Sequence, residues 1–432
     1  MQSSGDSTAP KRLRILDDAE LAAMYGRPCF TADERIRSFT LTPAEHEVLQ
    51  LLRVVSSQTA FILQLGYFRA KQLFFSFGFD EVEADVHYVL TRYFPQTQAT
   101  ELHALNKRTI LKQHHLISAL FRYQRCGAYE RQQLEARARQ SARISSKPIY
   151  VFRDLIQYLT DQRIVAPGYT ILQTIVGRAL TYEQHRLTSL VGTLVNPTEC
   201  AALDQLCAVA DGLYPMTLLK RAPKDFSLGE MRREITRADQ LGPLYQLATR
   251  VLPQLTISNE NITYYASLVT YYSVFRLQQL DAPIIHLYLL CFVFHRYQRL
   301  HDNLLNGFIH HVRRFSDAAK EAAKERVYTY RIESNQNLPK AGQVLKLFTD
   351  DRVDDTTAFA AVQAKAFATL DRDHLDRIAD YIATNASFDE TAFHWDHIDA
   401  LAHQFKRHLR PILLTVDLAA TRANAGLMEA VA

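Results

Sequence analysis

The chain has 432 residues, 47% of them hydrophobic and 22% charged, which excludes a largely disordered protein and predicts about two to four folded domains. Its longest apolar stretch, Ile284 to Phe294, is shorter than the roughly 18 residues of a membrane helix, so we expect a buried core helix there. The net charge of +4 is uneven: Lys107 to Lys147 holds ten Lys or Arg against two acids, and Asp350 to Asp399 holds twelve acids against four bases. We therefore expect only the N-terminal part to face a polyanion.

The N-terminal residues 1–14 are predicted to form a disordered tail, and the lack of an apolar stretch after their basic side chains excludes a secretory signal. Beyond the tail, Gly and Pro are sparse at fourteen each, and apolar residues recur at helical spacing. Thr42 to Glu45 (TPAE) has the order of N-cap, proline and acid that begins a helix with a capping box. Phe61, Leu65 and Phe68 then follow one helical stripe. The sequence predicts a mainly α fold.

The segment from Lys107 to Arg125 predicts a helix that is apolar on one side and cationic on the other. Such a helix suits contacts to phosphates or insertion into a major groove, and the side chains of Gln113 and His114 can reach base edges. A solvated helix face is an equally good interpretation of this charge run taken alone. The residues expected to face the core are Ile110, Leu111, Ile117, Leu120 and Phe121, and those expected at the rim or exposed are Lys107, Arg108, Lys112, His115, Arg122 and Arg125.

The central part of the chain continues the helical pattern. Val151 to Leu159 carries its apolar residues on one stripe, and a turn follows at residues 166–169. Thr170 to Leu190 weakly resembles a helix-turn-helix around Gly177, although Arg178 and Glu183 stand where that motif has apolar side chains. A DNA-binding motif at this place therefore rests on little more than spacing.

The C-terminal part is polar and acidic. Polarity rises from Asn335 to Pro339, which predicts a break, and Ser387 to Glu390 has the spacing of another helix start. Four aromatic residues near helical spacing can cover a neighbouring helix or close this region's own core; these are Phe388, Phe393, Trp395 and Phe405.

Signatures of catalysis are absent from the sequence. It contains no phosphate-binding glycine loop, no His-Glu-x-x-His and no Gly-x-Ser-x-Gly. His394 and His397 share a helix face without an evident third or fourth ligand, and the acids that open the region at Asp350 suit a helix N-terminus better than a magnesium site. The five cysteines are scattered and never spaced Cys-x-x-Cys, which excludes a disulfide or zinc framework and fits a reducing cytosol.

Several segments together resemble, in order, the N-terminal half of the transposases of the Tn-three family of replicative bacterial transposons. The segments that carry the resemblance are Ser38 to Phe75, Lys107 to Arg125, Tyr150 to Leu190, Tyr297 to Leu304 (YQRLHDNL), Ala323 to Tyr328 (AKERVY), Leu338 to Asp351 (LPKAGQVLKLFTDD) and Phe388 to Leu414.

The resemblance implies two consecutive helical, helix-turn-helix-like DNA-binding modules, at residues 15–146 and 147–295, and an acidic helical linker and dimerisation region at residues 296–432. The modules would read the terminal inverted repeats of the transposon. The family's Asp-Asp-Glu domain, which binds magnesium, is expected beyond residue 432. No catalytic residue, metal site or cofactor is therefore expected within this chain.

The implied partners are double-stranded DNA with transposon inverted repeats and a second protomer in a homodimer, in the bacterial cytoplasm at the nucleoid and away from membranes. Three alternatives remain open: a standalone regulator or repressor of transposition, an enzyme fragment with its own nuclease activity, and a helical interaction protein without a nucleic-acid partner. The candidate DNA-binding residues are Arg69, Lys71, Lys107, Arg108, Lys112, Gln113, His114, Arg122, Arg125, Lys147 and Arg178.

Overall fold

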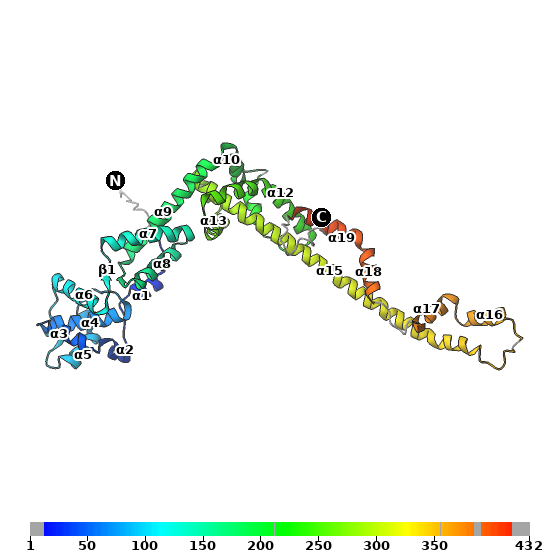
Figure 1. Cartoon of the computed structure of the whole chain (residues 1–432), viewed down its shortest axis with the longest axis horizontal. Helices are drawn as coiled ribbons and strands as arrows, with labels where there is room; N and C mark the ends of the chain where they lie inside the picture. Colours follow the sequence, from blue (N-terminus) through cyan, green and yellow to red (C-terminus); the bar gives the residue numbers. More distant parts are fainter. Residues whose placement is uncertain (1–12, 211, 355, 384–389, 417–432) are drawn as a thin grey trace, which may run out of the picture. The chain divides into compact units, whose positions relative to one another are not determined.

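The computed structural model describes residues 13–210, 212–354, 356–383 and 390–416. It is 77% helical, with helices α1 to α19 and two strands of two residues each, which confirms the predicted mainly α class (Figure 1). Most of the predicted tail, residues 1–12, lies outside the described residues. The chain divides into unit 1, Met1–Pro215 with Leu247–His295, and unit 2, Met216–Gln246 with Arg296–Ala432.

Unit 1 holds most of the helices and both strands. Its helices are α1 (Asp18–Tyr25), α2 (Ala32–Phe39), α3 (Pro43–Gln50), α4 (Val55–Lys71), α5 (Glu83–Tyr93), α6 (Lys107–Phe121), α7 (Ala128–Ile144), α8 (Pro148–Asp161), α9 (Tyr169–Leu194), α10 (Pro197–Asp204), α13 (Asn259–Tyr271) and α14 (Val274–Gln278). Its 3-10 helices and strands are η1 (Asp80–Val82), η2 (Ala99–Glu101), η3 (Gln205–Cys207), η4 (Leu252–Leu255), β1 (Gln124–Arg125) and β2 (Ile164–Val165).

The remaining helices cross from one unit to the other along the chain or belong to unit 2. Those that cross are α11 (Pro215–Leu219), α12 (Leu228–Val251) and α15 (Ala282–Lys346), and those of unit 2 are α16 (Phe359–Thr369), α17 (Arg372–Ala383), α18 (Glu390–Ala400) and α19 (Ala402–Thr415).

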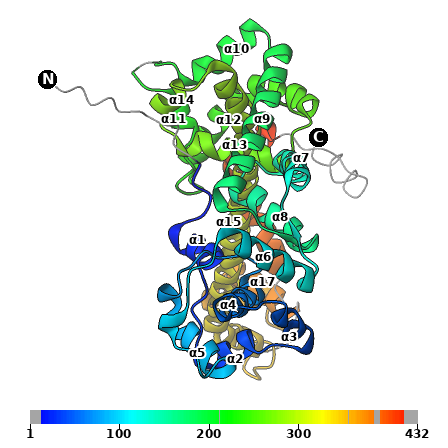
Figure 2. The same ribbon diagram turned by 90° about the vertical axis from the view of Figure 1, so that its left-hand side faces the viewer.

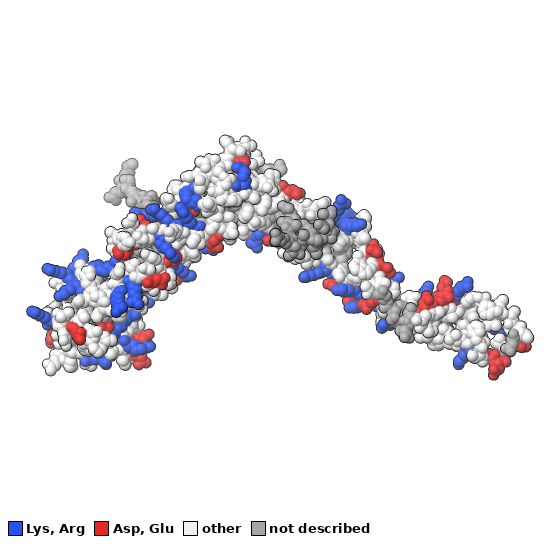
Figure 3. All heavy atoms as spheres, in the orientation of Figure 1, with Lys and Arg blue, Asp and Glu red and all other residues white. Residues whose placement is uncertain are grey.

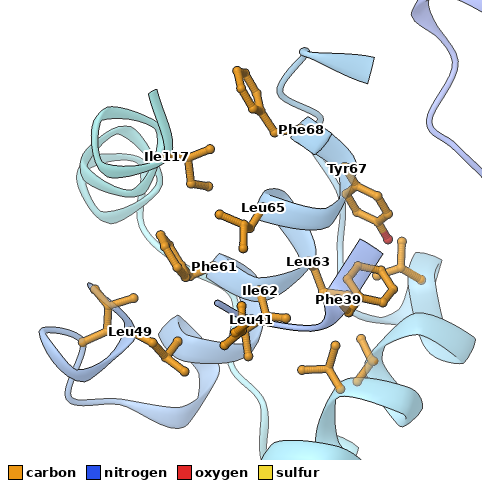
Figure 4. Close-up of a cluster of buried hydrophobic side chains, with 14 of the residues drawn as sticks. Phe39, Leu41, Leu49, Phe61, Ile62, Leu63, Leu65, Tyr67, Phe68 and Ile117 are labelled. Atoms are coloured by element: carbon orange, nitrogen blue, oxygen red, sulfur yellow. The ribbon is translucent and has the colours of Figure 1, made fainter. Parts of the chain in front are cut away.

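The first core of unit 1 surrounds α4. Every residue from Thr59 to Phe68 is buried, because α2, α5 and α6 all contact this helix. Phe61, Leu65 and Phe68 lie in this core, as their spacing predicts (Figure 4). The ring of Phe39 lies so close to Gly66 that an added Cβ would come within 2.4 Å of it. A glycine is needed here for close packing rather than for an unusual backbone angle.

The second core of unit 1 is formed by α7, α8 and α9, which pack against one another (Figure 2). Leu134 of α7, Leu155 of α8 and Leu172 of α9 are all fully buried in it. Only residues 145–147 separate α7 from α8, so the module boundary expected at residues 146 and 147 falls inside this single core.

The local predictions have mixed outcomes. The helix start at Thr42 is confirmed, because α3 begins at Pro43 and the Thr42 N–H donates to the Glu45 carboxylate at 2.7 Å. The turn around Gly177 is wrong, because α9 is one helix from Tyr169 to Leu194. The break near Pro339 is also wrong, because α15 continues to Lys346. The helix start at Ser387 lies outside the described residues.

Unit 2 has two small apolar clusters. In one, Met231 of α12 and Leu304 of α15 pack with Leu409 and Ile412 of α19. In the other, the end of α15 packs against α16 and α17 through five buried residues, namely Ala341, Val344, Ala366, Leu370 and Ile378. Residues 216–246 fall in unit 2 together with residues 296–432.

A buried carboxylate joins α12 to α15 within unit 2. Glu234 is fully buried and forms ion pairs with Arg237 and with Arg296, the latter at 3.3 Å. The Asn303 amide donates to the same carboxylate at 3.0 Å. Because each buried charge has an opposite charge and hydrogen bonds, this network is stabilised only while all its members are present.

Candidate nucleic-acid interface

The basic segment forms α6, as its periodicity predicts, and local contacts define both ends of this helix. At the start, the Asn106 side chain accepts the Thr109 N–H at 2.9 Å. At the end, Arg122 adopts the left-handed conformation with φ 58°, and the Tyr123 N–H donates to the Ser118 carbonyl at 2.8 Å. The chain therefore turns sharply after Phe121 instead of continuing the helix.

The inner face of α6 packs against α4. Ile117 is fully buried in the first core. Gln113 is 1% exposed, and its Nε2 donates to the Ser57 carbonyl at 2.8 Å and to the Ser57 hydroxyl at 2.9 Å. Gln113 is thus a structural contact between two helices, and the prediction that it reaches base edges is wrong.

The outer face of α6 is cationic. Four side chains are exposed on it, at positions i, i+1, i+5 and i+8 of one stripe: Lys107, Arg108, Lys112 and His115. Leu111 lies within this stripe and is 37% exposed, so its predicted place in the core is wrong. In Figure 3, basic side chains gather over the part of unit 1 that α6 forms.

Two further cations follow the end of α6. Arg122 and Arg125 are exposed, and Arg125 lies 3.5 Å from the Nε2 of His115. Within the part of the chain that the structure describes, none of the five cations of this region forms an ion pair with a carboxylate. We call them the α6 cationic face: Lys107, Arg108, Lys112, Arg122 and Arg125.

Arg163 lies in this region too, although no sequence pattern pointed to it. The Gln124 N–H donates to the Arg163 carbonyl at 2.8 Å, and β1 pairs in parallel with β2, so Arg163 lies beside the turn that follows α6. Its side chain is exposed. Nearly forty residues separate Arg163 from Arg125, so only the pairing of the two strands brings them together.

Arg69 has a structural role instead of the predicted DNA contact. Its guanidinium donates to the carbonyls of Ser38 and Thr40, at 2.6 and 2.7 Å, and forms an ion pair with Glu45. The side chain is 18% exposed. Because its donors hold the end of α2 and the start of α3 against α4, the prediction for Arg69 is wrong.

His114 is half-buried between α6 and the segment after α4. Its ring stacks on Phe74 with centroids 4.0 Å apart, and its Nε2 is buried without a hydrogen-bond partner among the described residues. Burial, together with the charge of Arg125, lowers the pKa of His114 to about 4. The ring is therefore neutral at pH 7, and the buried Nε2 cannot contact a base in this conformation.

Three other candidate residues lie apart from the α6 cationic face and already have partners. Lys71 donates to the Ala23 carbonyl. Lys147 forms an ion pair with Glu260 at 2.6 Å, and Arg178 one with Glu135 at 3.6 Å. The last two are exposed, and an exposed ion pair contributes little stability, so DNA contact by Lys147 and Arg178 stays a prediction.

Other kinds of site find no support in the described ranges. No group of three or more His, Cys, Asp or Glu in them is arranged to hold a metal ion. No helix among them is long and apolar enough to cross a membrane. None of the five cysteines, all of which lie in these ranges, forms a disulfide.

Comparison with known families gives one match. Residues 15–179 match a domain described as Domain of unknown function (DUF4158). The matched range includes both cores of unit 1 and the whole α6 cationic face, and it ends within α9. No curated protein matches the chain.

Proposed function

We propose that this chain binds double-stranded DNA through the α6 cationic face and recognises the terminal inverted repeats of a transposon. The observation that carries the proposal is the set of five exposed cations around α6, none of them in an ion pair with a carboxylate among the described residues. Elsewhere in unit 1, many arginines already have acidic partners, as Arg137 has Asp154 at 2.7 Å. Unpaired cations keep their attraction for phosphate and release counterions when they bind it.

The surroundings of α6 also suit a duplex. The helix rests on α4 through Ile117 and Gln113, so its outer face is held on a packed core. A rigid helix can present its side chains to a groove without a large loss of conformational entropy on binding. Leu111 is the apolar residue within the stripe, and it can contact the methyl group of a thymine.

The assignment to a transposon rests on two likenesses. The chain resembles the N-terminal half of Tn-three family transposases, and the domain that matches residues 15–179 is associated with that family. We propose that the chain supplies end recognition in a transposase of this kind, that residues 296–432 pair two protomers, and that phosphodiester chemistry belongs to a separate domain. A standalone regulator that occupies the transposon ends is the second candidate, since it would make the same DNA contacts.

A binding assay with two duplexes tests the proposal. Fluorescence anisotropy is measured with a labelled duplex that carries the terminal repeat of the element encoding the chain, and with a scrambled duplex of equal length and composition. We expect the repeat to bind at least about a thousandfold more tightly, as is typical of sequence-specific proteins. Equal affinity for both duplexes would leave a nonspecific DNA-binding protein, and no binding to either would refute the proposal.

The same complexes, incubated with magnesium or manganese, test the proposal that phosphodiester chemistry belongs to a separate domain. We expect no nicks in either strand, because no metal-holding group is present among the described residues. Protein-dependent nicking that is lost when acids of this chain are replaced would instead favour the nuclease alternative.

A further inference from the structure

A cavity of about 670 Å³ lies in unit 1 on the inner side of α6. Its walls come from α4, α5, α6, the segment of residues 75–80 and the segment of residues 99–105. Ala60 and Val86 are buried in its wall, whereas Thr100 and Ala104 are exposed and mark its opening. The volume falls in the range of about 300 to 1,000 Å³ that is typical of small-molecule sites.

The wall formed by α4 and α6 carries two amide side chains, and one of them has an open acceptor. Gln64 uses both ends of its amide, since it donates to the Phe75 carbonyl and accepts the Phe75 N–H at 3.4 Å. Gln113 uses only its Nε2, for Ser57. Because that contact fixes the orientation of the amide, the Gln113 Oε1 remains as an acceptor, and no donor among the described residues reaches it.

The opening of the cavity is acidic. Asp80 and Glu83 line it, both are exposed, and neither forms an ion pair within the described ranges. Two such carboxylates repel an anionic ligand, including the phosphates of a nucleic acid. The apolar wall in turn disfavours a ligand that would bury a charge. The cavity is therefore separate in its chemistry from the cationic face on the other side of α6.

We infer that this cavity is a binding site for a small, uncharged, mainly apolar molecule with an N–H or O–H group to donate to the Gln113 Oε1. The apolar part lies against Ala60, Val86 and Ile110 of α6. The inference does not depend on the proposed DNA binding, since it involves the opposite face of α6.

Two matched fluorescent probes test the inference on the full chain without DNA. N-phenylnaphthylamine is neutral, aromatic and carries one N–H, and anilinonaphthalene sulfonate has the same ring system with an added negative charge. We expect the neutral probe to bind saturably at one site per chain. We expect the anionic probe to bind at least about tenfold more weakly, because Asp80 and Glu83 repel the sulfonate.

Cavity variants locate the site. Ala104→Phe fills the opening from an exposed position and Ala60→Leu fills the wall, so each is expected to weaken binding of the neutral probe by about tenfold or more. Ala136→Phe, at an exposed position of α7 away from the cavity, is the matched control and should bind the probe as the parent does.

Circular dichroism of each variant shows that it is folded, and if Ala60→Leu is not, the exposed Ala104→Phe decides. Any one of three results would overturn the inference: no saturable binding of the neutral probe, equal affinity for the two probes, or the parent's affinity for the neutral probe in a folded cavity variant. None of these outcomes would count against DNA binding. Loss of DNA binding would in turn not change the affinities expected for the probes.

Discussion

Lys112 and Gln113 are neighbours in the chain with opposite roles in the fold. Lys112 is exposed on the outer face of α6, and Gln113 is buried against Ser57 of α4. At 100° per residue, one step along a helix is enough to move a polar side chain from solvent into a core. A buried amide must then have a hydrogen-bond partner, and Ser57 provides two acceptors for it.

The close contact at Gly66 makes a prediction about stability. Gly66→Ala places a methyl group against the ring of Phe39, which is fully buried and has little room to move. We expect the free energy of unfolding to fall by about 1 to 3 kcal/mol, as overpacking of a core does. Urea denaturation measures the change, and an unchanged midpoint and slope would show that the first core is less tightly packed than described.

The half-buried His114 makes a prediction about pH. Its pKa is lowered from 6.5 to about 4 in the folded chain, so the unfolded chain takes up the proton first as the pH falls. The contribution of the neutral ring to stability is therefore complete above pH 6.5 and is lost progressively between pH 6.5 and pH 4.

Comparison of the parent with His114→Phe isolates this effect, because other groups titrate alike in both. We expect the stability of the parent to fall more steeply than that of the variant between pH 7 and pH 5, as measured by urea denaturation at each pH. Parallel profiles for the two proteins would contradict the assigned pKa.

At the scale of elements, the continuity of α9 is the feature that sequence patterns missed. Gly177 marked an expected turn, but nothing lies within 4 Å of an added Cβ there, and its backbone is helical. Gly177→Ala should therefore raise the free energy of unfolding by about 0.5 to 1 kcal/mol, because alanine loses less entropy in a helix. Destabilisation by this substitution would favour a turn and a separate helix-turn-helix at Gly177.

The sequence predicted a helix correctly where its apolar residues form a single stripe. The periodicity of α6 and α8 predicted both helices, the four buried residues of α8 and, in α6, the buried Ile117. It misplaced Leu111, since apolar character alone does not decide which side of a helix is covered.

Contacts between segments that lie far apart in the chain could not be predicted from the sequence. The partners of Arg69 lie 24 to 31 residues before it, and Arg163 reaches the α6 region only through pairing of β1 with β2. Cations with and without an acidic partner look alike in the sequence, although a neighbouring carboxylate weakens the attraction of a cation for phosphate.

At the scale of the whole molecule, the two units differ in what they expose. Unit 1 carries the α6 cationic face, whereas unit 2 holds the acidic stretch from Asp350 to Asp399. Unit 2 also exposes aromatic side chains, among them Trp395, which is 58% exposed. We expect the stretch from Asp350 to Asp399 to pair protomers rather than to contact DNA, because its excess of carboxylates repels a polyanion.

Removal of one aromatic side chain tests this role without disturbing the fold. Trp395→Ala should weaken self-association by about tenfold or more if the ring is buried between protomers, as aromatic residues at interface centres often are. Tyr271→Ala, at a position of unit 1 that is 86% exposed, is the control and should associate as the parent does. Sedimentation or light scattering over a range of concentrations gives the result, and equal association of all three proteins would remove Trp395 from any interface.

The central claim, that the α6 cationic face holds the phosphates of a duplex, is tested most directly by the salt dependence of DNA binding. The α6 variant replaces Arg108 and Lys112 with alanine. The control, the α15 variant, replaces Lys320 and Lys324 with alanine, which removes the same charge from two exposed lysines of α15 that are paired with Asp317 and Glu321. The α6 variant should bind more weakly, and its slope of log affinity against log salt should decrease by about two, because two phosphate contacts are lost. The α15 variant should keep the slope of the parent. An unchanged slope in the α6 variant, or the same decrease in both, would show that the DNA does not contact this face.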